Sequence, residues 1–360
     1  MNPHLPLSVL DLAPVPEGTA PSTAVRRTVE LAALAERLGY VRYWFAEHHS
    51  MPSIGSSAPE VLIAHVAAHT NRIRVGAGGI MLPNHAPLRI AEAFQTLEAL
   101  HPGRIDLGIG RAPGSAPNAS RALRSHDGEQ FTALLAEMLA LSRGQIPGGH
   151  ALAGLEVMPD DVALPPVWIL GSSGAGATLA GNAGMGYAFA SHFSPTRPAP
   201  ALQAYRESFR PSAQFPKPHA ILAVAAYCAE TGERARHLAK SMELHWLQIR
   251  RGHFAPIPSP ETALAHPWTP TERAAVAEMS ALGIIGTPDV VRERIERMAG
   301  ECGADEVMIV AFIHDHAARL RSYELIAEAF DQPPLHTAPV PGHGSRDLSA
   351  QPAAPERASP

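Results

Sequence analysis

The chain has 360 residues and a formal net charge of −5, with 46% apolar and 18% charged residues. This is enough apolar material for a large core and too little charge for a disordered chain. The scattered basic residues argue against binding to nucleic acid or to an anionic membrane surface, and no apolar run approaches the roughly 18 residues of a membrane span. The chain does not open like a signal peptide, so we expect a cytoplasmic protein that acts on small molecules.

Eight short apolar runs recur along the chain, and each is predicted to be a β-strand. They are continuously apolar rather than alternating, which is typical of strands buried on both faces of a parallel sheet. The runs lie at residues 7–13, 41–46, 74–82, 104–110, 167–170, 187–190, 220–227 and 307–312.

Segments with helical periodicity separate these runs. The first begins near Pro21 and stops at Gly39, and the next two begin at Pro59 and near Pro87, where proline suits a first helical turn. Further helices are predicted over residues 129–141, 175–183, 199–209, 233–249 and 288–302. A doubly wound sheet also alternates, but eight strand–helix units without a dinucleotide fingerprint favour an α/β fold of the (β/α)₈ TIM barrel type.

Two stretches depart from this alternation. Residues 250–275 are rich in proline, aromatic residues and histidine and are too long for a connector, so we expect an insertion before the last strand that covers something. From Gln332 onward the chain has almost no large apolar residue and cannot repay the entropy of ordering. We therefore expect a barrel domain at residues 1–331 and a disordered tail at 332–360.

The second predicted strand ends in three titratable residues, Glu47, His48 and His49. Active sites of α/β barrels gather at the C-terminal ends of the strands, where these residues fall. Adjacent strand residues point in opposite directions, so only one of the two histidines can face the barrel mouth. The residues alone leave open whether they serve catalysis or bind loop carbonyls.

Other strand ends add polar groups to the same rim. Asp11 ends the first strand, Arg111 follows the fourth, and His192 follows the sixth. The pair Gly78-Gly79 lies within the third strand, where it indicates a bulge, a flat ligand against the backbone, or close packing.

The stretch GSSGAGATLAG at 171–181 passes from a strand through a glycine- and serine-rich turn into a helix. Free amides at a helix N-terminus, with the hydroxyls of Ser172 and Ser173, suit a phosphate monoester. Arg111 could supply the balancing charge in a bidentate pair. A turn of this kind without any ligand is the alternative.

Four stretches together resemble the luciferase-like flavin monooxygenase family over most of residues 5–330, and their order and spacing make the resemblance specific. They are YWFAEHHS, RVGAGGIMLPNHAPLRIAEAFQTLEALHPGRIDLGIGRAPG, VWILGSSGAGATLAGNAGMGYAFASHFSP and IIGTPDVVRERIERM. The resemblance implies a barrel that binds reduced FMN at the C-terminal rim, usually as a homodimer. It also implies a separate flavin reductase, and oxygen-dependent chemistry on a small apolar substrate.

The resemblance also assigns roles near the flavin ring. His48 matches a histidine that acts as an acid/base group, for which a pKa near the working pH is expected. Glu47 would orient that histidine or its loop. Gly78-Gly79 matches a non-proline cis peptide behind the ring.

At the phosphate end, Arg111, Ser172 and Ser173 match phosphate contacts, and Gly174 and Gly176 add backbone amides. One position departs from the pattern. Bacterial luciferase has a hydroxyl side chain where Gly176 stands, so only an amide can contribute here.

Two other enzyme classes remain as alternatives. A deazaflavin-dependent dehydrogenase on the same barrel would share the phosphate and histidine positions. A metal-dependent hydrolase would draw on His314-Asp315-His316, whose spacing can put two imidazoles on one strand face, although this triplet could instead cap the final helix.

Overall fold

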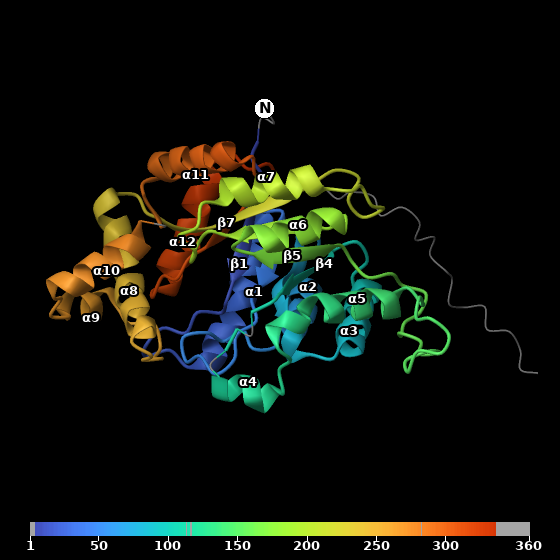
Figure 1. Cartoon of the computed structure of the whole chain (residues 1–360). Coiled ribbons are helices and arrows are strands. Elements are labelled where there is room, and N and C mark those ends of the chain that lie inside the picture. Colours follow the sequence, from blue (N-terminus) through green and yellow to red (C-terminus); the bar gives the residue numbers. More distant parts are fainter. Residues whose placement is uncertain (1–3, 113, 116, 282, 336–360) are drawn as a thin grey trace, which may run out of the picture.

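The computed structural model describes residues 4–112, 114, 115, 117–281 and 283–335, and its centre is a closed parallel barrel (Figure 1). The ring closes because β7 pairs with both β9 and β6, and β9 pairs with β1. The strands of the ring are β1 (Leu7–Asp11), β2 (Arg42–Phe45), β3 (Arg74–Met81), β4 (Ile105–Gly110), β5 (Val167–Gly171), β6 (Gly186–Ala190), β7 (Ala220–Cys228) and β9 (Glu306–Val310). The predicted TIM barrel is confirmed, and each predicted strand is present.

The remaining strand of the described residues, β8 (Ile284–Gly286), was not predicted. It pairs only with the end of β7, at Ala226, Tyr227 and Cys228, and so lies outside the closed ring. Three residues carry no periodic signal from which a strand could be predicted.

Helices follow the strands around the barrel (Figure 1). Those that the sequence predicted are α1 (Pro21–Arg37), α2 (Pro59–Ala68), α3 (Pro87–Leu100), α5 (Phe131–Ser142), α6 (Gly174–Asn182), α7 (Pro198–Ser208), α8 (Gly232–Arg250) and α11 (Pro288–Cys302). Several begin at a proline, whose missing N–H costs nothing in a first turn. Those not predicted are α4 (Pro117–Leu123) and the 3₁₀ turns η1 (Leu82–Asn84) and η2 (Gly128–Gln130), while α12 (His316–Ala329) is the expected final helix, for which no bounds were predicted.

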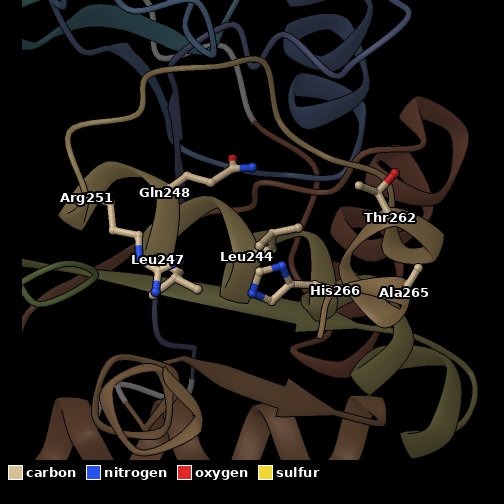
Figure 2. A pocket seen from close by; sticks show the side chains of 7 residues that line it. All are labelled: Leu244, Leu247, Gln248, Arg251, Thr262, Ala265 and His266. Atoms are coloured by element: carbon tan, nitrogen blue, oxygen red, sulfur yellow. The ribbon is translucent and has the colours of Figure 1, made fainter. Parts of the chain in front are cut away.

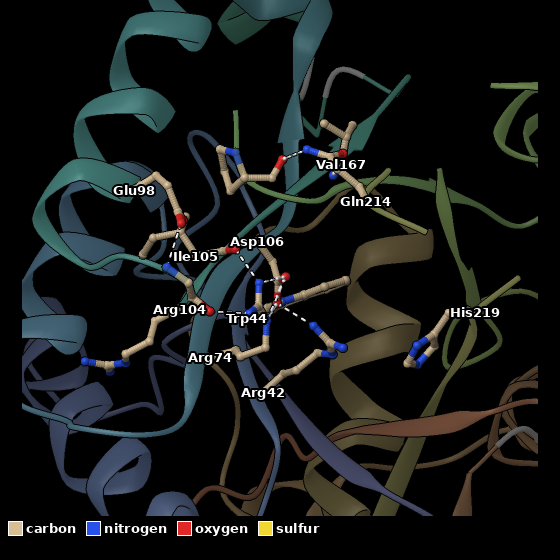
Figure 3. A network of polar contacts seen from close by, with 12 residues as sticks. Arg42, Trp44, Arg74, Glu98, Arg104, Ile105, Asp106, Val167, Gln214 and His219 are labelled. Atoms are coloured by element: carbon tan, nitrogen blue, oxygen red, sulfur yellow. Dashed lines mark hydrogen bonds and ion pairs between the residues drawn. The ribbon is translucent and has the colours of Figure 1, made fainter. Parts of the chain in front are cut away.

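A network of ion pairs fills the N-terminal end of the barrel (Figure 3). Arg42, the first residue of β2, contacts Asp106 at 2.8 Å and Glu306 at 3.0 Å, and Arg74 contacts Asp106 at 2.7 Å. Trp44 also donates to Asp106, at 3.1 Å. Burial opposes ionisation, yet the adjacent arginines hold the pKa of Asp106 well below its usual range. This end is closed and stabilised by charge, which leaves the opposite end for chemistry.

The predicted insertion before the last strand is confirmed and is largely helical. It comprises the end of α8, then α9 (Pro260–Ala265) and the start of α10 (Pro270–Ser280), which stand together on one side of the barrel in Figure 1. These helices share a small apolar core separate from the barrel's own, made by Leu244, Leu247, Ala263, Val276 and Trp268.

The tail predicted from Gln332 falls mostly at residues 336–360, which lie outside the described residues. Just before them, the Gln332 side chain donates to the Leu5 carbonyl at 2.9 Å, and Leu335 packs on the core. Over the described ranges, none of the helices has the length and apolarity that crossing a bilayer requires.

Candidate active site

The strand order places the predicted site residues along one arc of the rim. β2, β3, β4, β5 and β6 are consecutive neighbours and all parallel, so their C-terminal ends lie side by side. His48 follows β2, Arg111 follows β4, Ser172 and Ser173 follow β5, and His192 follows β6. Gly78-Gly79 lies near the end of β3.

The Gly78-Gly79 peptide bond is cis, as the family resemblance implied. The register with β4 shifts between Gly78 and Ile80, so a bulge is present. A Cβ on Gly79 would lie 2.1 Å from Leu170 Cδ1, and one on Gly78 would lie 2.9 Å from Leu10 Cδ1. Close packing therefore excludes a side chain at both positions, while part of the Gly78 backbone stays accessible.

Glu47 is fully buried and orders the loop after β3 rather than His48. Its carboxylate accepts hydrogen bonds from the Met81 amide at 2.8 Å and Asn84 Nδ2 at 3.0 Å, and lies within 2.7 Å of His49 Nε2 and 3.0 Å of His85 Nε2. Burial opposes its charge, but these bonds lower its pKa. Of the two roles that the resemblance allowed, the hydrogen bonds support the positioning of a loop.

His48 is held by its backbone, whose amide donates to the Ser56 carbonyl at 3.0 Å. Its Nδ1 is buried and has no hydrogen-bond partner among the described residues. Burial lowers the pKa of His48 to about 4, against the opposing effect of Glu47. The expectation of a pKa near the working pH is therefore wrong for this structure, because desolvation dominates. His48 is neutral at pH 7.

His192 shares the mouth with His48. Burial lowers its pKa to about 4, a hydrogen bond with the Ala223 backbone opposes that shift, and the charge of His48 would lower it further. Its Nδ1 is also buried without a hydrogen-bond partner in the described part of the chain. His192 was expected on the rim without a role, and its position directly after a strand is the signal that could have given it one.

A third buried histidine, His245 on α8, gives a test of this effect on stability. It is 2% exposed, and burial lowers its pKa to about 4. The unfolded chain then binds a proton that the folded chain does not, so stability falls as the pH drops from about 6.5 towards 4. We expect that the chain with His245→Leu takes up about one proton fewer when it unfolds near pH 5. The slope of its free energy of unfolding against pH then falls by about 1.4 kcal/mol per pH unit.

Urea denaturation at several pH values between 4.5 and 7 measures this slope, and His65→Leu on the exposed face of α2 is the matched control. A slope unchanged by His245→Leu would contradict the burial effect.

The N-terminus of α6 is open to a ligand. Ser173 is its N-cap residue but makes no capping hydrogen bond through its side chain, and Ser173 and Gly174 are both exposed. A Cβ built on Gly174 meets nothing within 4 Å. Tyr187 donates to the Ser173 carbonyl at 3.0 Å and so fixes the turn. Arg111 is exposed and forms no ion pair with any described residue. Free amides with a free guanidinium one strand away fit a phosphate monoester.

Asp11 does not join this rim, contrary to our expectation. Its Oδ1 accepts from Arg319 Nη2 at 2.8 Å, and Tyr43 donates to the other oxygen. Arg319 belongs to α12, so Asp11 faces the helices and not the mouth.

The triplet His314-Asp315-His316 does not form a metal site. Asp315 caps α12 by accepting from the Ala318 amide at 2.7 Å, and His316 Nε2 lies 2.9 Å from Glu30. Across the described positions, no group of three or more His, Cys, Asp or Glu side chains could hold a metal ion.

The segment at 253–259 is fastened to the loop after β1, at the C-terminal end of the barrel. The Glu17 amide donates to the Ile257 carbonyl at 2.8 Å, and the Ile257 amide donates to the Val15 carbonyl at 2.9 Å. The Glu17 carboxylate accepts from Thr262 Oγ1 at 2.7 Å and from the Ser259 amide at 3.2 Å. Part of residues 250–275 is thereby attached at the C-terminal end of the barrel, and their covering role stays a prediction.

Two cavities lie near the insertion. The larger, about 460 Å³, lies between α8 and α9 (Figure 2) and is lined by Leu244, Leu247, Gln248, Arg251, Thr262, Ala265 and His266. None of these residues comes from a barrel strand. The smaller, about 30 Å³, is lined by His192 and by Ala225 and Tyr227 of β7, so it belongs to the mouth.

The chain belongs to the luciferase-like monooxygenase family, whose model matches residues 5–306. A luciferase-like monooxygenase of Escherichia coli (strain K12) is 41% identical to it and covers 90% of this chain and 97% of its own length. Another relative, the N-acetyl-S-alkylcysteine monooxygenase of Bacillus subtilis (strain 168), is 33% identical over 90% of this chain and 97% of its own.

Among solved structures, apo-MsnO8 superposes with a TM-score of 0.83 at 38% identity, over 92% of this chain and all of its own. More distant structures share the fold. The oxygenating constituent of 3,6-diketocamphane monooxygenase from Pseudomonas putida, in complex with FMN, has a TM-score of 0.69 at 18% identity, covering 91% of this chain and 97% of its own. An F420-dependent secondary alcohol dehydrogenase has a TM-score of 0.64 at 14% identity, covering 91% of this chain and 99% of its own.

Proposed function

We propose that this protein is an FMN-dependent monooxygenase that uses reduced FMN and molecular oxygen on a small apolar organic substrate. The observation that carries the proposal is the set of open groups on neighbouring strand ends. The N-terminus of α6 and Arg111 suit a phosphate, and the accessible Gly78 backbone with His48 suits a flat ring.

Each residue of this arc has a distinct task. Ser172, Ser173 and the amides of Gly174 and Gly176 bind the phosphate, with Arg111 as its counter-ion. The accessible backbone of Gly78 gives the flavin ring a flat surface without side chains, and the buried Gly79 beside it adds no side chain. When bound, reduced FMN supplies the reactivity towards oxygen and the electrons for the reaction.

His48 serves as the proton carrier next to the ring. A neutral imidazole can accept a proton at one ring nitrogen and return it, without acting as a nucleophile. A bound anion nearby would raise its pKa from about 4 towards the working range. Glu47 acts indirectly, because it fixes the loop at Met81 and Asn84. The segment at 253–259 excludes water from the mouth.

The partners follow from the same proposal. A separate flavin reductase supplies reduced FMN, and the enzyme works as a homodimer in the cytoplasm. The second candidate is a deazaflavin-dependent dehydrogenase, favoured by the shared fold with an F420-dependent alcohol dehydrogenase. The two differ in their need for oxygen.

An anaerobic titration of the purified protein separates these candidates. Reduced FMN and reduced F420 are each added while the flavin absorbance is followed, and oxygen is then admitted while its uptake is recorded. We expect binding of reduced FMN and rapid oxygen consumption. Tight binding of F420, with no oxygen-dependent reaction, would replace the proposal by the dehydrogenase.

His48→Ala tests the proton carrier. We expect the variant to bind reduced FMN within about threefold of the parent, because the phosphate contacts are untouched, and to lose about 10²- to 10⁴-fold in turnover, as general acid–base groups contribute. His65→Ala on the surface is the control. Full turnover in His48→Ala would remove the assigned role.

A further inference from the structure

The smaller cavity lies on the inner side of the barrel mouth. Ala225 pairs with Val310 and Ile221 pairs with Glu306, and Glu306 faces the ion-pair network inside the barrel. Residues alternate along a strand, so Ala225 and Tyr227 face the interior as well. The cavity is lined by His192, Ala225, Tyr227, Ala239, Met242, Glu243, Trp246, Gly283 and Ile285.

His192 contributes a buried, unpaired ring nitrogen to this cavity. Its Nδ1 has no hydrogen-bond partner within the described residues, and the Ala223 backbone favours the protonated form of the ring. We assign the neutral ring the tautomer that carries its proton on Nε2, which leaves a lone pair on Nδ1. In this tautomer Nδ1 is a hydrogen-bond acceptor, and a buried acceptor without a partner costs about 1–3 kcal/mol until something donates to it.

The other lining groups restrict the charge of a ligand. Met242 and Ile285 are apolar, Trp246 and Tyr227 are aromatic with one polar atom each, and none of the residues that line the cavity is a lysine or arginine. The one lining carboxylate, Glu243, is already held by Lys240 at 2.7 Å. An anion would therefore lose its hydration here without finding a counter-ion.

We propose that His192 is the specificity-determining residue for the substrate, and that the substrate is a small, uncharged, largely apolar molecule with a hydroxyl or N–H group that donates to His192 Nδ1. This inference rests on the proposed function, because it places the substrate in the same mouth as the flavin ring. The cavity of about 30 Å³ has the volume of about one water, so it must widen to admit a substrate, and Met242 is the flexible side chain of its lining that can move.

The test uses three model compounds and the full chain without flavin. Benzyl alcohol carries a donor, benzyl methyl ether lacks it, and benzoate is an anion. Binding is followed by the fluorescence of Trp246, which lines the cavity, and Trp246→Phe identifies its signal. We expect benzyl alcohol to bind about 3- to 10-fold more tightly than the ether, as one neutral hydrogen bond provides, and benzoate to bind most weakly.

Three variants assign this preference to one atom. His192→Phe keeps an aromatic ring and is expected to bind alcohol and ether equally. His192→Gln keeps an acceptor and should retain the preference, and His65→Phe on the exposed face of α2, away from the cavity, is the matched control that also retains it.

Equal affinities for alcohol and ether in the parent protein, including no binding of either, would overturn the proposal, and so would tighter binding of benzoate. FMN binding of His192→Phe is measured separately, so that this result and the flavin assignment succeed or fail independently.

Discussion

Arg42→Met is expected to lower the free energy of unfolding by about 3–5 kcal/mol, the usual cost of removing one partner from a buried ion pair. Arg42 contacts Asp106 and Glu306, both of which are almost completely buried. Burial would lower the pKa of Arg42, but these two carboxylates raise it above its ordinary value. After the substitution Asp106 keeps Arg74, whereas Glu306 keeps His219 and Ser8 as its only side-chain partners among the described residues.

The penalty should come from the charge left unpaired rather than from lost packing. We therefore expect the double variant Arg42→Met with Glu306→Gln to recover part of the loss. Arg297→Met is the control, because Arg297 and Glu293 form an exposed pair at 3.6 Å that contributes about 1 kcal/mol or less. Urea denaturation gives all three values. A loss for Arg42→Met no larger than that for Arg297→Met would show that the network is not structurally important.

The barrel could be predicted because its signals are local. Each strand of the ring is a continuous apolar run, and helices such as α2, α3 and α11 begin at a proline. β8 could not be predicted, since it has three residues and depends on pairing with β7. The small core of α9 and α10 likewise depends on contacts with Leu244 and Leu247 of α8, far from them in sequence.

The site was predictable in position but only partly in orientation. The strand ends gave the residues of the rim, yet the direction of a side chain depends on the register of the strand. Asp11 was expected at the mouth and instead contacts Arg319, a residue 308 positions away. The low pKa of His48 could not be predicted either. It comes mainly from burial, which is set by the whole fold and not by the neighbours Glu47 and His49.

Ser173→Asp is expected to weaken FMN binding by at least about 100-fold without destabilising the protein. Ser173 is the N-cap of α6 and makes no capping hydrogen bond. Aspartate is among the favoured N-cap residues, so its carboxylate can accept from the free amides of the first turn. It would then occupy the positions that we assign to the phosphate and repel it, and like charges in contact cost several kcal/mol.

The substitution is informative because it should weaken FMN binding without lowering the stability of the protein. A substitution that merely damaged α6 would lower the melting temperature and FMN affinity together, whereas Ser173→Asp should leave the melting temperature unchanged or raise it. Ser173→Asn is the matched control, because asparagine has nearly the same shape and capping ability as aspartate but carries no charge. Calorimetric titration with FMN compares the three proteins. If Ser173→Asp binds FMN as tightly as Ser173→Asn does, the phosphate does not bind at the N-terminus of α6, and Arg111 also loses its assigned role.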